Sequence, residues 1–150
     1  MRWMLFVAAG LAAVVALVAI VGAMLPRDHV ATRTLATRHT PEELWALITD
    51  PAFARDATGE DVPVETVESV PPNRLVSRIA DPNLPFGGTW TYTIAKTPTG
   101  ATLTIAEAGY VSNVIFRFVS RFVIGHHATM DKFLKAVASR LKEDPVLTGQ

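Results

Sequence analysis

The longest apolar segment of the chain lies at its N-terminus. The run from Trp3 to Leu25 contains no charged, amide or hydroxyl side chain, and only two glycines interrupt its hydrophobic residues. As a helix it would extend about 34 Å, which exceeds the roughly 30 Å hydrocarbon core of a bilayer. Residues 1–26 are therefore predicted to form a transmembrane anchor, and the protein is expected to be a single-pass membrane protein.

A cleaved signal peptide is the alternative interpretation of this segment. Val21-Gly22-Ala23 resembles the small-residue cleavage site of such peptides. However, the apolar run is longer than the roughly 7–15 residues of a signal-peptide core, and this length favours an uncleaved anchor. Arginines flank the run on both sides, so their distribution does not predict which side of the membrane the C-terminal domain occupies.

Residues 27–144 have the periodicities of a small α+β domain. Residues 30–37 alternate and are rich in β-branched side chains, which predicts a strand. A helix is predicted to begin after Thr40, because Thr40 and Glu43 have the spacing of a capping box around Pro41. It is expected to stop at Asp50-Pro51.

Four further strands and one final helix complete the predicted domain. The strand-like runs are residues 62–70, 74–80, 88–97 and 101–111. Their turns predict hairpins and an antiparallel sheet, with Trp90, Tyr92 and Ile94 on its core face. From residue 112 to 143 apolar side chains recur every three or four positions, which predicts one helix of about 30 residues, with Gly125 as a site for a bend. Residues 145–150 are expected to form a tail.

Charge and composition exclude several classes of function. The chain has 14 basic and 14 acidic residues, without the clustered basic side chains that nucleic-acid binding requires. It contains no cysteine, which excludes disulfides, a thiolate nucleophile and a cysteine-based zinc site. The sequence also lacks a glycine-rich phosphate loop and a Gly-x-Ser-x-Gly motif, so no cofactor and no metal are expected.

Three stretches carry a further signal: residues 39–45 (HTPEELW) with Thr49-Asp50, residues 84–92 (LPFGGTWTY), and residues 116–118 (FRF) leading to 125–130 (GHHATM). In this order they resemble the START/Bet v1-like superfamily, also called SRPBCC, and specifically its polyketide cyclase/dehydrase-like, membrane-anchored members. The resemblance spans roughly residues 26–141. It implies a helix-grip fold, in which an antiparallel sheet curls around a long C-terminal helix and an apolar ligand lies between them.

The chain departs from this superfamily after its first helix. Members usually have an extra pair of strands there, whereas only residues 51–61 fill the gap in this sequence. The resemblance therefore implies a reduced helix-grip domain with a sheet of about five strands. Its groove would be open at one side, or closed by another chain or by lipid.

The resemblance also implies which side chains would line that groove. The candidate ligand-binding residues are aromatic, soft or polar-tipped residues on the segments that the fold turns inward: Trp45, Trp90, Tyr92, Phe118, Phe122, His126 and Met130. Such a lining suits a lipid, an acyl chain or a polyketide-like molecule. A stripe of aromatic residues is also typical of an ordinary hydrophobic core.

Two of the histidines are adjacent in the predicted final helix. His126 falls on the apolar stripe, where it would meet a ligand's polar end or carry a proton, although a hydrogen-bonded core histidine is the simpler interpretation. His127 is expected to face solvent. Neighbouring helical residues point about 100° apart, so the pair cannot share a metal ion.

Glu107 is the second weak candidate for acid–base chemistry. If its strand alternates strictly, Glu107 points toward the core and would act as a general base or accept a hydrogen bond from a ligand. A bulge near Gly109 that turns the carboxylate outward, or a salt bridge with Arg117 or Arg121, is the simpler alternative.

The sequence leaves three hypotheses for function. The first is a membrane-anchored domain that binds an apolar ligand drawn from the bilayer. The second is a noncatalytic interaction module whose sheet edge pairs with a partner or with a second copy as a homodimer. The third is a cyclase/dehydrase-type enzyme that uses His126 or Glu107. It comes last because no nucleophile motif accompanies these two residues.

Overall fold

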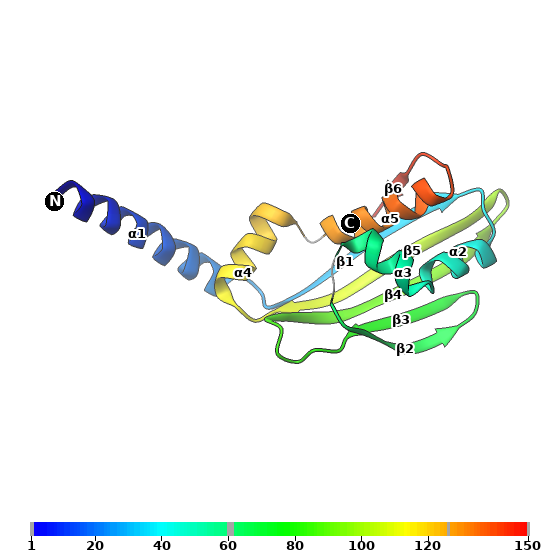
Figure 1. The fold of residues 1–150 in the computed structure, drawn as a ribbon, viewed down its shortest axis with the longest axis horizontal. Coiled ribbons are helices and arrows are strands. Elements are labelled where there is room, and N and C mark those ends of the chain that lie inside the picture. The colour runs from blue at the N-terminus through cyan, green and yellow to red at the C-terminus, as the bar shows by residue number, and fades with distance from the viewer. Residues whose placement is uncertain (1, 60–61, 126, 150) are drawn as a thin grey trace.

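The computed structural model describes residues 2–59, 62–125 and 127–149 (Figure 1). It has an α+β fold: an N-terminal apolar helix, α1 (Arg2–Met24), projects from a domain built on an antiparallel sheet. The strands are β1 (Asp28–Thr37), β2 (Val64–Val70), β3 (Arg74–Ile79), β4 (Phe86–Thr97), β5 (Gly100–Val111) and β6 (Val146–Thr148). The other helices are α2 (Pro41–Ile48), α3 (Pro51–Thr58), α4 (Val114–Val119), the π-helix η1 (Ser120–Ile124) and α5 (Ala128–Arg140).

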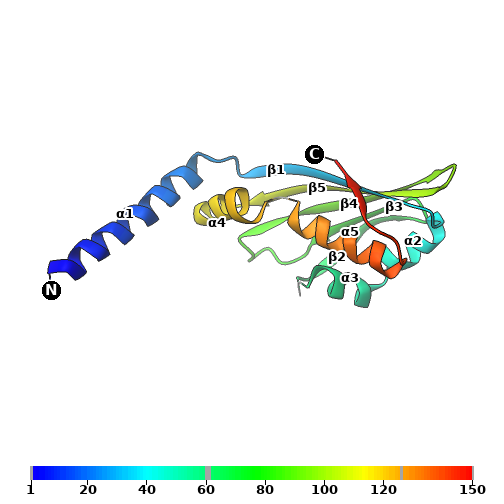
Figure 2. The same cartoon turned by 90° about the horizontal axis from the view of Figure 1, so that it is seen from above.

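The sheet has the order β2-β3-β4-β5-β1-β6, and α2, α3 and α5 lie on one of its faces (Figure 2). Strict alternation places Trp90, Tyr92 and Ile94 of β4 on that face, beside the matching row of β5. The hydrophobic core fills the space between the sheet and the three helices. Its largest fully buried side chains are Phe133, Leu35, Leu44, Leu103, Ile105, Met130, Leu134 and Val137.

Local signals account for the start of α2. The hydroxyl of Thr40 accepts a hydrogen bond from the Glu43 amide at 3.3 Å, and the Glu43 carboxylate accepts one from the Thr40 amide at 2.9 Å. The predicted capping box is therefore confirmed. After α2, Asp50 accepts a hydrogen bond from Ala52 and begins a separate short helix, α3, with Pro51 in its first turn.

The sheet has six strands, and the prediction of about five is wrong. The sixth comes from the predicted tail, because Val146–Thr148 pairs with the free edge of β1. Arg33 of β1 supports this pairing by donating to the Gly149 carbonyl oxygen at 2.6 Å and to the Asp131 carboxylate at 2.8 Å. Three residues are too few to produce a periodic pattern, so only docking on β1 defines this strand.

The predicted single C-terminal helix is also wrong, because the described residues form α4 with η1 and then the separate helix α5. The break lies at Gly125, whose φ of 80° is readily accessible only to glycine. Before the break, the Gly125 amide donates to Ser120 at 2.9 Å, closing a π-type turn. The apolar stripe is continuous in sequence, but its first half packs beside α1 and only its second half covers the sheet.

The helix α1 is long and apolar enough to cross a membrane, a property that it shares with signal sequences. Most of its side chains are exposed outside the domain. Its end makes an exception, because Gly22 is buried against α4. The chain then enters β1 after three residues, Leu25-Pro26-Arg27.

Glu143 ties the end of α5 to the end of β1. The Thr37 hydroxyl donates to its carboxylate at 2.6 Å, and the Arg38 amide and guanidinium donate to it at 3.2 and 3.1 Å. The hydrogen bond from Thr37 holds the pKa of Glu143 below its usual value of 4.5. A lowered folded-state pKa stabilises the fold above the unfolded-state pKa, and this contribution is lost as the pH falls through the folded-state value.

We therefore expect Glu143→Gln to lower the free energy of unfolding by about 1 kcal/mol at pH 7. The difference in the free energy of unfolding between the variant and the wild-type chain should shrink as the pH falls below the pKa of a free carboxyl group. At such a pH the wild-type carboxylate becomes protonated too. The free energy of unfolding can be measured by urea denaturation of the full chain in neutral detergent, with tryptophan fluorescence as the signal. Asp144→Asn is the matched control, and a difference independent of pH would contradict the assignment.

Candidate functional site

The interface between α5 and the sheet is filled by the protein's own side chains. Phe133 of α5 lies at its centre, with ring centroids 6.1 Å from Trp90, 5.8 Å from Tyr92 and 5.8 Å from Phe53. Burial raises the pKa of Tyr92 to about 12, against the opposing effect of a hydrogen bond with Ser77. Four predicted ligand-binding residues lie in this region: Tyr92 and Met130, which are buried, and Trp45 and Trp90, which are partly buried.

Phe118 and Phe122 do not join this group. Their rings lie 4.9 Å apart on α4 and η1, and the Phe118 side chain faces Gly22 of α1. The expectation that they line one groove with Trp90 is corrected by the break at Gly125, which redirects this half of the stripe. His126 lies outside the described residues. His127, expected to face solvent, is partly buried, and its buried Nε2 has no hydrogen-bond partner among the described residues.

Glu107 faces the helix-covered side of the sheet, as strict alternation predicts, and no bulge interrupts β5 near Gly109. Its carboxylate oxygen lies 3.5 Å from His29 Nε2, so its ionisable neighbour is a histidine and not the predicted Arg117 or Arg121. Burial lowers the pKa of His29, and the nearby charge of Asp28 opposes this shift. Burial therefore favours the neutral form of the His29 imidazole.

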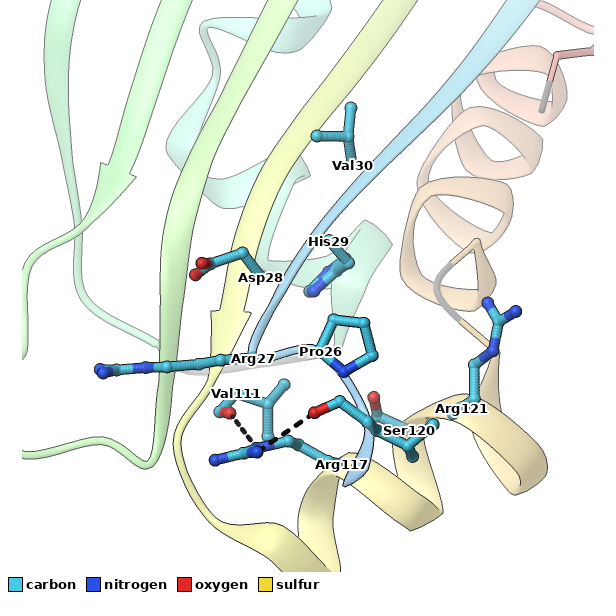
Figure 3. Close-up of a pocket in the computed structure, with 10 residues that line it drawn as sticks. Pro26, Arg27, Asp28, His29, Val30, Val111, Arg117, Ser120 and Arg121 are labelled. Atoms are coloured by element: carbon cyan, nitrogen blue, oxygen red, sulfur yellow. Dashed lines mark hydrogen bonds between the residues drawn. The ribbon is translucent and has the colours of Figure 1, made fainter. Parts of the chain in front are cut away.

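A cavity of about 310 Å³ lies at the junction of α1, the start of β1, the end of β5 and the α4–η1 segment (residues 114–124) (Figure 3). Apolar side chains from Leu25, Pro26, Val30 and Val111 form part of its wall. Its polar lining includes five residues in addition to Asp28: Arg27, His29, Arg117, Ser120 and Arg121. The cavity is therefore amphipathic, and its lining residues include three arginines and one aspartate.

Arg117 holds the junction together through backbone carbonyl groups. Its guanidinium donates to Leu25 at 3.2 Å, to Val111 at 3.0 Å and to Ser112 at 3.0 Å. These three carbonyls lie just after α1, at the end of β5 and before α4. All three partners are neutral, so the positive charge of Arg117 stays uncompensated by them.

The other two arginines of the cavity also lack a carboxylate partner within the described part of the chain. Arg27 lies over the ring of Tyr110, 5.2 Å from its centroid. Arg121 extends from η1, on the opposite side of the cavity from Asp28 (Figure 3). The Asp28 side chain points away from His29 on β1, toward the other face of the sheet.

The α4–η1 segment is amphipathic. Arg117, Ser120 and Arg121 have the i, i+3, i+4 spacing of one helical face and line the cavity. Large apolar side chains of this segment are exposed: Ile115, Phe116, Phe122, Val123 and Ile124. They belong to a segment that lies beside the apolar helix α1, because α4 packs against the last turns of α1.

Comparison with solved structures supports the fold of the domain. A conserved protein from Geobacillus kaustophilus is similar, with a TM-score of 0.61 and 12% identity over 79% of this chain and 99% of its own. A Mesorhizobium loti protein has a TM-score of 0.57 and 20% identity, over 77% of this chain and 97% of its own. A Chromobacterium violaceum protein has a TM-score of 0.53 and 18% identity, over 80% of this chain and 100% of its own. The TM-scores support a shared α+β fold. Identities this low carry no information about activity.

No protein-family model matches the chain, and no curated protein matches it. Within residues 2–59, 62–125 and 127–149, no group of three or more His, Asp or Glu side chains is arranged to hold a metal ion.

Sequence reasoning placed Arg117 in the FRF motif and, with Arg121, as a possible partner of Glu107. It considered Arg27 only as a charge that flanks the apolar run. One signal was available: two arginines four residues apart are the only charged residues in the otherwise apolar run from Val114 to Ile124. Such spacing predicts an amphipathic helix with one cationic face. The remaining wall comes from residues far away in sequence, which no local pattern connects.

The contact between α1 and α4 depends on Gly22. A Cβ at this position would overlap the Val114 carbonyl oxygen, whereas a Cβ at Gly10 would meet nothing within 4 Å. We expect Gly22→Val to push α4 away from α1, while Gly10→Val leaves the junction unchanged. Spin labels on cysteines introduced at Ala23 and Ile115 would report a longer, broader distance in the Gly22 variant only. Equal distributions in both variants would refute this close packing.

Proposed function

We propose that this protein is a membrane-anchored lipid-binding domain, with α1 as an uncleaved anchor and a reduced helix-grip fold. The observation that carries this proposal is the exposed apolar face of the α4–η1 segment, which continues the surface of α1. Five large apolar side chains on a short segment are costly to leave in water. Beside a membrane-spanning helix, the same face would be covered by acyl chains.

The charges of the segment support this orientation. Arg117 and Arg121 line the cavity, and the large apolar side chains of the segment are exposed. A helix with an apolar face and a cationic face is typical of segments that lie in the interfacial layer of a membrane. The domain would then hold the cavity at the level of the lipid headgroups.

We place the ligand at this junction and not between α5 and the sheet. The latter region is occupied by Phe133 and its aromatic neighbours, so a lipid there would require displacement of the core. At the junction, an apolar surface and a polar cavity already lie side by side. This arrangement keeps the expected ligand class and changes its position.

Pairing through a sheet edge is the second candidate function. Every residue of β2 is exposed, including Val64, Val67 and Val70. A bulge near Thr66 and ion pairs to β3 blunt this edge, as in strands that natural proteins protect from pairing. These features rank edge pairing, including a homodimer, below lipid binding. Catalysis at Glu107 remains third, now with His29 as its neighbour.

A membrane-depth measurement tests the proposal. Because the chain has no cysteine, a fluorophore can be attached to a single cysteine at Val123, which is 72% exposed. In phosphatidylcholine vesicles we expect blue-shifted emission and quenching by lipids with a nitroxide on the acyl chain. The matched control is a label at Val64, which is 64% exposed in β2 and should be quenched only by water-soluble agents.

The intact mass of the chain extracted from membranes completes this test. Retention of residues 1–25 supports an uncleaved anchor, whereas their loss would identify a signal peptide. Equal access of a water-soluble quencher to both labels would refute the contact between the α4–η1 segment and lipid.

A further inference from the structure

We propose that the junction cavity binds a phosphate group with at least one negative charge, supplied by the headgroup of an anionic lipid. The cationic site follows from the cavity itself, and its assignment to a lipid rests on the proposed function. The described part of the predicted groove between α5 and the sheet does not suggest this ligand chemistry, because aromatic side chains fill it.

The charge balance around the cavity favours an anion. Two guanidinium groups, from Arg117 and Arg121, lie on the α4–η1 wall of the cavity, and neither of them forms a salt bridge within the described residues. Two carboxylates of β1 and β5 are engaged or directed elsewhere: Glu107 lies beside His29, and Asp28 points to the other face of β1. The uncompensated positive charge therefore faces the cavity.

Arg117 and Arg121 have different roles. Arg117 is fixed by three carbonyl groups, so it supplies a permanent positive charge without the cost of ordering its side chain. Among the described residues Arg121 makes no such bonds, and a guanidinium can bind phosphate oxygens in a bidentate manner. The hydroxyl of Ser120 adds a donor on the same wall.

Size and surroundings favour a headgroup. A volume of about 310 Å³ lies at the lower end of the range for small-molecule sites, which suits a headgroup better than a whole lipid. The apolar side chains of Leu25 and Val111 form another part of the wall. From there the apolar surface of α1 and the α4–η1 segment offers a path for the acyl chains.

Native mass spectrometry of the full chain in neutral detergent tests the site. We expect phosphatidylglycerol to bind at least about fivefold more tightly than phosphatidylcholine with the same acyl chains, because only the former has net negative charge. Arg121→Gln should reduce this preference to less than about twofold, and Arg121→Lys should retain part of it. The matched control is Arg140→Gln at the end of α5, which removes the same charge far from the cavity and should keep the full preference.

Inorganic phosphate distinguishes the source of the anion. A preference for phosphatidylglycerol that millimolar phosphate does not reduce supports a lipid headgroup. Competition by inorganic phosphate, lost in Arg121→Gln, supports the anion site but overturns its restriction to lipid. Equal affinity for both lipids without phosphate binding, or equal losses in Arg121→Gln and Arg140→Gln, overturns the site.

The label at Val123 tests the proposed function independently of the anion site. If the anion site fails, a lipid-buried label at Val123 would leave the proposed function intact, whereas a water-exposed label would refute the proposed function separately.

Discussion

The hydrogen bonds of Arg117 connect the apolar N-terminal helix to the sheet domain. Arg117 joins the carbonyl groups that follow α1, end β5 and precede α4, so the apolar helix, the sheet and the α4–η1 segment meet at a single guanidinium. Gly22 permits the same junction from the other side, because only the absence of a side chain lets α4 approach α1 so closely. The cavity, its cationic wall and the exposed apolar face all depend on this arrangement.

Elements specified by neighbouring residues were predictable from the sequence. The capping box of Thr40 and Glu43 and the alternation of Trp90, Tyr92 and Ile94 are local patterns, and both have the expected structure. Gly125 was predicted as a site for a bend in the final helix, and the chain does break there. The separation into two segments was not predictable, because the apolar stripe continues on both sides of Gly125 although the two halves have different partners. β6 was missed for a related reason: its three residues become a strand only on the edge of β1.

The same distinction applies to the candidate site. The direction of Glu107 followed from alternation, but its neighbour His29 belongs to another strand, and pairing of β1 with β5 brings the two together. Burial of Phe133 among aromatic rings shows that a stripe typical of ligand pockets is here largely a core. The arginine cavity combines residues near positions 27 and 120, and no spacing rule relates side chains so far apart.

The short connection between α1 and β1 has a mechanical consequence. Only Leu25, Pro26 and Arg27 separate the two elements, proline restricts the backbone, and Arg117 holds the Leu25 carbonyl group. A sheet joined in this way cannot swing as it would on a flexible tether. With α1 in a bilayer, the domain would travel sideways at a constant height and tilt, so its encounters would be restricted to molecules within a thin layer above the membrane surface.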